Sequence, residues 1–168
     1  VAFRLLNASR EGTRQAAGPT FGRIGLVEVL QAAQNHPHLA SMLEGPNRGR
    51  GIAVGSWFNG SGPASAIASV NPDGTIGLVE GSPDIGGSRA AMAMHLAEVL
   101  GIPATDVKPS IGDTDSIGYS SGAGGSGVTF KMGTAVYQAA EDVRNQLIER
   151  AARIWEVDPA EVTYSDGM

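Results

Sequence analysis

Apolar residues recur at helical spacing in three parts of the chain. The first stripe covers residues 24–35, the second 92–100 and the third 129–154, and glycine or proline follows the first two. The third predicts a helix of about 26 residues and about 39 Å. Residues 1–9 resemble the end of another helix. The predicted buried faces are Met92, Leu96, Val99 and Leu100 in the second stripe, and Val136, Ala140, Val143, Leu147, Ala151 and Ile154 in the third.

Between the first two stripes the pattern changes to short apolar runs. They cover residues 51–59, 64–70 and 75–80 and are typical of an antiparallel meander. The connection at residues 71–74, Asn-Pro-Asp-Gly, predicts a tight turn, because proline fixes φ and glycine accepts the left-handed conformation. The residues of the first run that we expect on a sheet face are Trp57 and Phe58.

Residues 107–111 and 162–165 are predicted to be further strands. Each follows a helix and a short Pro-Ala connection, at residues 102–107 and 157–162. The second connection has the start signal of a helical turn, with Asp158 as its cap. Two units of glycine turn, helix, Pro-Ala turn and strand result, which predicts an α+β fold with an antiparallel or mixed sheet.

Glycine is concentrated before the second and third helical stripes, in residues 81–87 and 112–127. Glycine exposes backbone N–H groups, and at the start of a helix these groups favour an anion, with phosphate as the obvious candidate. A mobile surface loop is the alternative interpretation of a glycine-serine segment. The position between a predicted strand and a helix, where connections are usually short, favours the anion site.

Residues 122–127 also match the dinucleotide pattern G-x-G-x-x-G. No hydrophobic strand leads directly into this segment. The acids about 20 residues further on, Glu141 and Asp142, lie inside the predicted helix. We therefore reject a Rossmann site.

Composition excludes several classes of protein. The 168 residues are 42% apolar, enough for one domain or two compact subdomains. The net charge of −5 without a basic cluster argues against a nucleic-acid surface. The absence of cysteine excludes disulfides and thiolate-bound zinc or iron–sulfur clusters within these residues. Neither a signal peptide nor an apolar run near 18 residues is present, so we expect a cytoplasmic location.

Two features at the ends lead us to expect a fragment of a longer protein. The sequence starts with Val1 and not with Met, and the Asp-Gly pair near its end is typical of a hairpin turn whose second strand would follow.

The three histidines are not assigned as metal ligands. His36 and His38 flank a proline at a predicted helix end, without cysteine or paired carboxylates nearby, which favours a turn. His95 falls at the edge of an apolar helix face. No catalytic residue is assigned either, because Glu80, Glu98 and Glu141 stand in no recognisable motif of a general base.

A set of short segments adds a further signal through its order and spacing. The set is Phe3-Arg-Leu-Leu-Asn7, Arg50-Gly-Ile-Ala-Val-Gly55, Gly81-Ser-Pro-Asp-Ile-Gly86, Leu96-Ala-Glu-Val-Leu-Gly-Ile102, Gly112-Asp-Thr-Asp115, Gly124-Gly-Ser126 and Gly133-Thr-Ala-Val-Tyr137. Each segment is weak alone. Together, over nearly the whole chain, they resemble the molybdopterin-binding large subunit of the xanthine dehydrogenase/aldehyde oxidase family of molybdenum hydroxylases.

The resemblance implies an internal fragment of such a subunit that helps to bind a molybdenum–molybdopterin cofactor. In bacteria this cofactor is usually a dinucleotide, for example the cytosine dinucleotide. In the family the D-I-G turn contacts the phosphates and the pterin, and the glycine-serine segment lies beside the metal. The cofactor-binding residues so implied are Asp84, Ile85, Gly86, Gly87, Ser88, Thr114, Asp115, Gly124, Gly125, Ser126 and Gly127.

Members of this family hydroxylate N-heterocycles or aldehydes with oxygen from water, or oxidise carbon monoxide. Their iron–sulfur clusters and FAD lie on other domains or subunits, which fits the absence of cysteine. The family's general-base glutamate and substrate-side arginine fall outside this chain. The resemblance therefore implies an oxidoreductase fragment, inactive alone, whose partners are the rest of the large subunit, iron–sulfur and flavin subunits and a small-molecule substrate, but no nucleic acid.

Two positions depart from the family pattern. Gly87 stands where many members have a glutamine, and Gly127 where many have an arginine. Two alternatives therefore stay open: a non-catalytic domain that keeps the fold for subunit association, and a phosphate- or nucleotide-binding module unrelated to molybdenum. As domains, we expect a helical lead-in over residues 1–48 and a partial cofactor-binding domain over residues 49–168.

Overall fold

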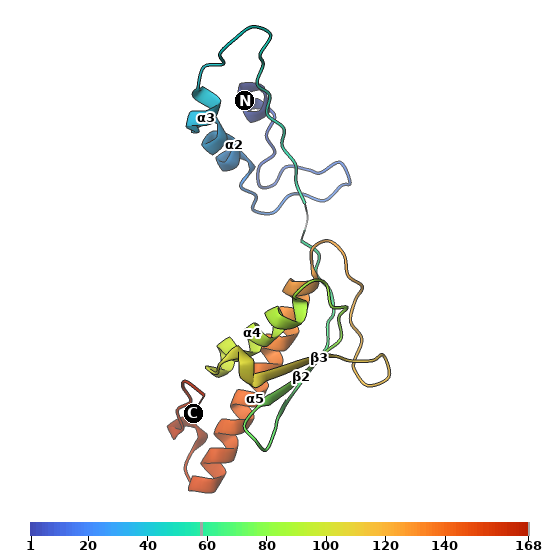
Figure 1. Ribbon diagram of the computed structural model, residues 1–168, viewed down its shortest axis with the longest axis vertical. Helices are drawn as coiled ribbons and strands as arrows, with labels where there is room; N and C mark the ends of the chain where they lie inside the picture. The colour runs from blue at the N-terminus through green and yellow to red at the C-terminus, as the bar shows by residue number, and fades with distance from the viewer. Residues whose placement is uncertain (58, 168) are drawn as a thin grey trace. The chain divides into compact units, whose positions relative to one another are not determined.

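The computed structural model describes residues 1–57 and 59–167. The chain forms two compact units, Val1–Ser56 and Trp57–Met168, which are described separately (Figure 1). No helix in the described residues is long and apolar enough to cross a membrane.

The first unit contains α1 (Ala2–Leu6), α2 (Leu26–Asn35) and α3 (Pro37–Ala40). His36 ends α2 and begins α3, where its Nδ1 accepts a hydrogen bond of 3.2 Å from the N–H of His38. The predicted helix-end turn at these histidines is therefore confirmed. Within the described residues, no group of three or more His, Cys, Asp or Glu side chains could hold a metal ion.

The strand predicted for residues 51–59 is wrong. Its described residues have no strand structure, and Phe58 lies outside the described residues. Trp57 is 74% exposed, so it does not pack on a sheet face. The two glycines within this run explain the difference, because glycine weakens a strand and supplies no side chain for packing.

The second unit contains a mixed three-stranded sheet of β1 (Ala66–Val70), β2 (Ile76–Glu80) and β3 (Val107–Ile111), in the order β1-β2-β3. β1 and β2 form an antiparallel hairpin through the predicted turn at residues 71–74, where Gly74 has a φ of 82°. β3 pairs parallel to β2. The α+β class with a mixed sheet is confirmed. The predicted antiparallel meander of residues 51–59, 64–70 and 75–80 is wrong in its first strand, and only the β1–β2 hairpin of it is present.

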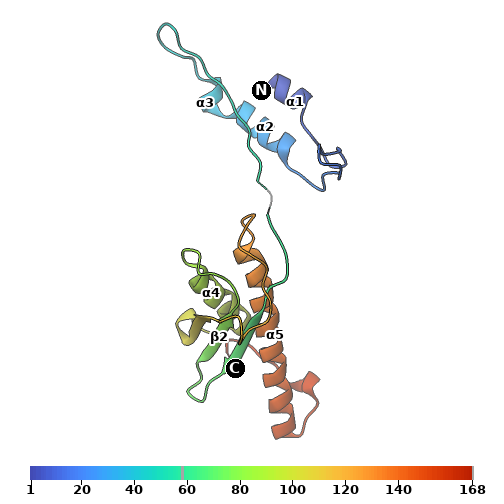
Figure 2. The same cartoon turned by 90° about the vertical axis from the view of Figure 1, so that its right-hand side faces the viewer.

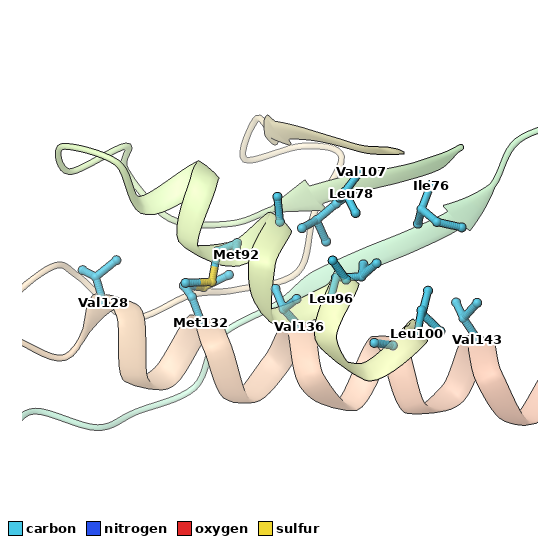
Figure 3. Close-up of a cluster of buried hydrophobic side chains, with 13 residues drawn as sticks. Ile76, Leu78, Met92, Leu96, Leu100, Val107, Val128, Met132, Val136 and Val143 are labelled. Atoms are coloured by element: carbon cyan, nitrogen blue, oxygen red, sulfur yellow. The ribbon is translucent and has the colours of Figure 1, made fainter. Parts of the chain in front are cut away.

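Two long helices cover one face of this sheet, α4 (Ser88–Leu100) and α5 (Val128–Trp155). They pack against each other beside the strands (Figures 1 and 2). Ile76 and Leu78 of β2 point toward both helices (Figure 3). The core consists of Ile76, Leu78, Met92, Ala93, Leu96, Ala97, Leu100, Val107, Val128, Met132, Val136, Ala140 and Val143.

α5 is longer than the core that it covers. Its 28 residues span about 42 Å, whereas strands of five residues span about 17 Å. Val136, Ala140 and Val143 are buried as predicted. Near the end of the helix, however, Ile154 is 63% exposed and Ala152 is buried in place of Ala151, so the predicted face is wrong there.

Each helix is followed by a short 3-10 turn, η1 (Ala104–Asp106) after α4 and η2 (Pro159–Glu161) after α5. The predicted cap of η2 is confirmed, since the Asp158 carboxylate accepts a hydrogen bond of 2.8 Å from the N–H of Ala160. The strand predicted for residues 162–165 is wrong. This segment packs against the end of α4, where no strand is available to pair with it, and the Tyr164 hydroxyl donates to the Leu100 carbonyl at 3.0 Å.

Replacement of Tyr164 by phenylalanine tests this contact. The ring would still pack, but the Leu100 carbonyl would lose its donor, so we expect the free energy of unfolding to fall by about 1 kcal/mol. Urea unfolding measures the change. Tyr119→Phe on an exposed tyrosine is the matched control, and equal values for both variants would contradict the docking of this segment.

Candidate functional site

The two glycine segments lie at the same end of the second unit. β2 and β3 are parallel, so their carboxyl ends meet at one edge of the sheet. Residues 81–87 connect β2 to α4, and residues 112–127 connect β3 to α5. The labelled residues of α4 and α5 follow one another in the same direction, so both helices start at this edge (Figure 3). Ligands of α/β sheets commonly bind outside the carboxyl ends of the strands.

The first segment is a turn held by Asp84. Its carboxylate accepts hydrogen bonds from the Ser88 hydroxyl at 3.1 Å and from Nε of Arg89 at 2.7 Å. Desolvation raises the pKa of Asp84, but these hydrogen bonds outweigh it and leave the pKa below its ordinary value. Gly87 has a φ of 85° at the start of α4, and no side chain caps this helix. The left-handed conformation explains why position 87 is glycine.

The second segment begins with an Asx turn. The Asp113 carboxylate accepts hydrogen bonds of 2.9 Å from the N–H groups of Asp115 and Ser116. Hydrogen bonds from Ser116 and Asp115 hold the pKa of Asp113 below its ordinary value. Thr114 and Asp115, which the family resemblance implicates, lie in this turn.

The glycine-rich part of the second segment is tightly packed at its end. Gly125 and Ser126 have φ values of 57° and 55°, and Gly127 at the start of α5 has a φ of −93°. The Gly60 N–H donates to the Gly125 carbonyl, and a Cβ on Gly127 would overlap the Gly60 carbonyl. Packing therefore explains the glycine at position 127. A left-handed residue before a right-handed one also turns successive N–H groups to one side, as in anion-binding nests.

The ammonium group of Lys131 holds the same segment in place through hydrogen bonds. Lys131 is 6% exposed, and its ammonium group donates to the Ser121 carbonyl at 2.7 Å, the Ser121 hydroxyl at 2.8 Å and the Gly122 carbonyl at 2.6 Å. These three bonds use all three protons of the ammonium group. Lys131 thus holds the start of the glycine-rich run in place.

A shallow hollow of about 400 Å³ joins the two segments. It brings Ile85 of the first turn together with Gly124, Ser126 and Gly127 of the second. Asp84, Gly86, Gly87 and Ser88 adjoin Ile85 in the chain, and Gly125 lies between lining residues, whereas Thr114 and Asp115 do not line the hollow. The lining residues are Ile85, Ala123, Gly124, Ser126, Gly127, Val128 and Thr129, none of them ionisable.

At three positions of this region, neither the backbone conformation nor a neighbouring atom requires glycine. Gly86, Gly122 and Gly124 do not adopt the left-handed conformation, and a Cβ on any of them would meet no atom within 4 Å. No side chain caps α5, as none caps α4. Bare backbone and uncapped helix starts leave N–H groups exposed where the dipoles favour negative charge. These residues fit a phosphate-bearing ligand held by backbone donors.

Four buried polar residues in the described part of the chain lie at this end of the unit, namely Glu80, Ser82, Ser88 and Lys131. Of these, the sequence predicted only Ser88 as a site residue. Glu80 alternates with the buried residues of β2, and Lys131 lies three residues after Val128 on the buried side of α5. These spacings are the signals in the sequence that could have revealed them.

The proteins that this chain resembles are described as molybdenum- or molybdopterin-binding. A family model described as molybdopterin cofactor-binding domain matches residues 27–168. The xanthine dehydrogenase molybdenum-binding subunit of Escherichia coli O157:H7 is 31% identical over 170 residues, which cover 90% of this chain and 22% of the relative. The aldehyde oxidoreductase molybdenum-binding subunit PaoC of the same organism is 28% identical over 178 residues, covering 99% and 23%.

Solved structures agree with these matches. The Cu,Mo-CO dehydrogenase in its carbon monoxide reduced state has a TM-score of 0.57 and 30% identity, covering 62% of this chain and 13% of that one. Quinoline 2-oxidoreductase from Pseudomonas putida 86 has a TM-score of 0.55 and 28% identity over the same shares. The chain spans about a fifth of the length of the curated relatives it matches. These matches confirm the resemblance noted from the sequence, and the chain belongs to the molybdopterin cofactor-binding domain family.

Proposed function

We propose that this chain is the part of a molybdenum hydroxylase large subunit that holds the phosphate-bearing portion of the molybdopterin cofactor. The turn at residues 81–88 and the loop at residues 112–127 form the two sides of the cradle. Backbone N–H groups at the starts of α4 and α5 bind the anionic groups, and Ser126 and Thr129 supply hydroxyls at its border.

The observation that carries this proposal is the unexplained glycine at positions 86, 122 and 124. Glycine costs backbone entropy on folding, and neither a turn nor a neighbouring atom of the described chain requires it at these positions. A ligand that lies against the backbone supplies the missing reason. Backbone N–H groups would hold such a ligand without side-chain donors. Binding is therefore compatible with glycine in place of glutamine at position 87 and in place of arginine at position 127.

When bound, the cofactor supplies the molybdenum redox chemistry by which relatives of this family act. The residues of this chain bind and orient it: Asp84 keeps the first turn closed, and Lys131 keeps the second loop in place. None of them is assigned a proton-transfer step. We propose an N-heterocycle or an aldehyde as substrate, and iron–sulfur and flavin domains or subunits as electron acceptors.

Substitution of Gly124 by leucine tests the cradle. The side chain would enter open space, so we expect the free energy of unfolding to change by no more than about 0.5 kcal/mol. The same side chain would occupy the hollow, so stabilisation by pyrophosphate should be lost. In the native chain, pyrophosphate at 100 times its Kd would add about 2.7 kcal/mol, which thermal unfolding can measure.

Gly22→Leu is the matched control, because a Cβ on Gly22 also meets open space, but in the first unit. Retained stabilisation by pyrophosphate in Gly124→Leu, or equal loss in Gly22→Leu, would contradict the cradle. The complete protein, expressed in a host that makes molybdopterin, should also carry molybdenum and an acid-releasable pterin. Pyrophosphate binding without either would leave a phosphate-binding module unrelated to molybdenum.

A further inference from the structure

The most unusual buried group in the second unit is the carboxyl of Glu80. It is the last residue of β2, it has 0% exposure, and its side chain follows Ile76 and Leu78 on the face that packs against the helices. Its Oε1 has no hydrogen-bond partner within the described structure. Leaving a buried carboxylate half-satisfied is costly, so this glutamate at the base of the first glycine turn requires a reason.

Glu80 is connected to both sides of the proposed cradle. The Ser82 hydroxyl lies 3.1 Å from its Oε2 and 3.4 Å from the Pro83 carbonyl, both within the first turn. The backbone carbonyl of Glu80 accepts a hydrogen bond of 2.9 Å from the N–H of Gly112, the first residue of the second segment. A shift in the position of Glu80 would therefore affect the first segment through the Ser82 hydroxyl. It would affect the second segment through the backbone hydrogen bond from Gly112.

The charged residues around Glu80 are either cations that are bound to other partners or acids. Lys131 of α5 spends its three protons on Ser121 and Gly122. Arg89 of α4 is paired with Asp84, whose negative charge opposes ionisation of Glu80. On the second segment the charged side chains are the acids Asp113 and Asp115, and Tyr119 is exposed. β1 has no ionisable residue, and Lys108 of β3 sits one position out of register with the buried face and donates to Thr105.

A neutral carboxyl suits this environment better than a carboxylate. With its proton on Oε2, Glu80 donates to the Ser82 hydroxyl, which is then free to donate to the Pro83 carbonyl. When Glu80 is ionised, the single proton of Ser82 must turn toward Oε2, so the Pro83 carbonyl loses one of its donors. It keeps the N–H of Ile85 at 2.9 Å and the Ser88 hydroxyl at 3.5 Å. Desolvation accordingly raises the pKa of Glu80, with Asp84 adding to the effect and Ser82 and Arg89 opposing it.

We propose that Glu80 is a positioning residue for the cofactor cradle, which holds the turn at residues 81–88 through a protonated carboxyl and loosens it on ionisation. The part that concerns the cradle rests on the proposed function, and the part that concerns the protonated carboxyl does not.

The sign of the pH effect follows from linkage. The folded chain keeps the proton of Glu80 to higher pH than the unfolded chain, where the carboxyl titrates at about 4.3. Stability is therefore unaffected below that pH and decreases as the pH rises through the folded-state value. Glu80→Gln keeps the shape and the neutral state, so it should remove this decrease.

The first experiment measures urea unfolding midpoints of the full chain between pH 4 and pH 9. Glu80→Gln should match the native chain at pH 4 and exceed it increasingly at higher pH, whereas Glu98→Gln on the exposed side of α4 should follow the native curve. Parallel curves for Glu80→Gln and the native chain would overturn the proposal. So would a carbon-13 titration midpoint for the native Glu80 carboxyl at or below that of Glu98.

The second experiment uses sulfate, whose charge is constant over this range, as the probe of the cradle. We expect its apparent affinity for the native chain and for Glu98→Gln to fall at least threefold between pH 5 and pH 9 as Glu80 ionises, and to stay nearly constant in Glu80→Gln. An equal fall in all three proteins would overturn the positioning role but not the anion site. Absence of sulfate and pyrophosphate binding at every pH would refute the proposed function and with it the role in the cradle, while the unfolding curves would still decide the protonation of Glu80.

Discussion

Replacement of Lys131 by methionine is expected to lower the free energy of unfolding by about 2–4 kcal/mol, because three acceptors around a buried ammonium group lose a charged donor. Methionine has a similar length and fills the space, so loss of packing adds little. The start of the glycine-rich loop is released, and stabilisation by pyrophosphate should fall with it. Urea unfolding with and without pyrophosphate measures both effects.

The chain offers one matched control, since Lys108 is its other lysine. The Lys108 ammonium donates to one exposed carbonyl, that of Thr105, at 3.0 Å. Lys108→Met should therefore change the free energy of unfolding by no more than about 0.5 kcal/mol and leave pyrophosphate binding intact. If the two variants behave alike, Lys131 does not fasten the loop.

Leu96→Ala is expected to have the larger effect on stability, a loss of about 2–5 kcal/mol. Leu96 has 0% exposure and lies between the sheet and α5 (Figure 3). Because elements on several sides hold the surrounding backbone, truncation of the side chain would leave a cavity. Thermal or urea unfolding measures the loss.

Ile154→Ala on α5 is the comparison for this variant. Ile154 has the pattern of a buried residue in the sequence but is 63% exposed, so its truncation should cost less than about 1 kcal/mol. A cost for Ile154→Ala as large as that for Leu96→Ala would mean that α5 is covered along its whole length.

Much of the fold could be predicted because its signals are local. The period of apolar residues gave α2, α4 and α5, and the Asn-Pro-Asp-Gly turn gave the β1–β2 hairpin. Pairing of β2 with β3 depends on residues separated by an entire helix, and it could not be read from either strand. The failure at residues 162–165 has the same origin, since a strand needs a partner that the segment itself does not specify, and at residues 51–59 the two glycines add to it.

The candidate site shows more clearly what the sequence alone cannot predict. The sequence locates both glycine segments but not the purpose of each glycine. Gly87 is required by a left-handed backbone, Gly127 by the nearby Gly60 carbonyl, and Gly124 by nothing within the described chain. The third kind points to a ligand where, as at Gly124, the glycine lines the hollow between the two segments. Likewise, the burial of Glu80 and Lys131 depends on neighbours from other elements, and charged residues are ordinarily expected at the surface.

The parallel pairing of β2 and β3 also orders events during synthesis of the chain. The β1–β2 hairpin involves neighbouring residues and can form early, whereas β3 can join β2 only after α4 has been made. The helices that define the site then need α5, which packs on both α4 and β1. We therefore expect the site to be complete on the ribosome only after α5 has emerged, so that cofactor loading is an event after translation of this region and not during it.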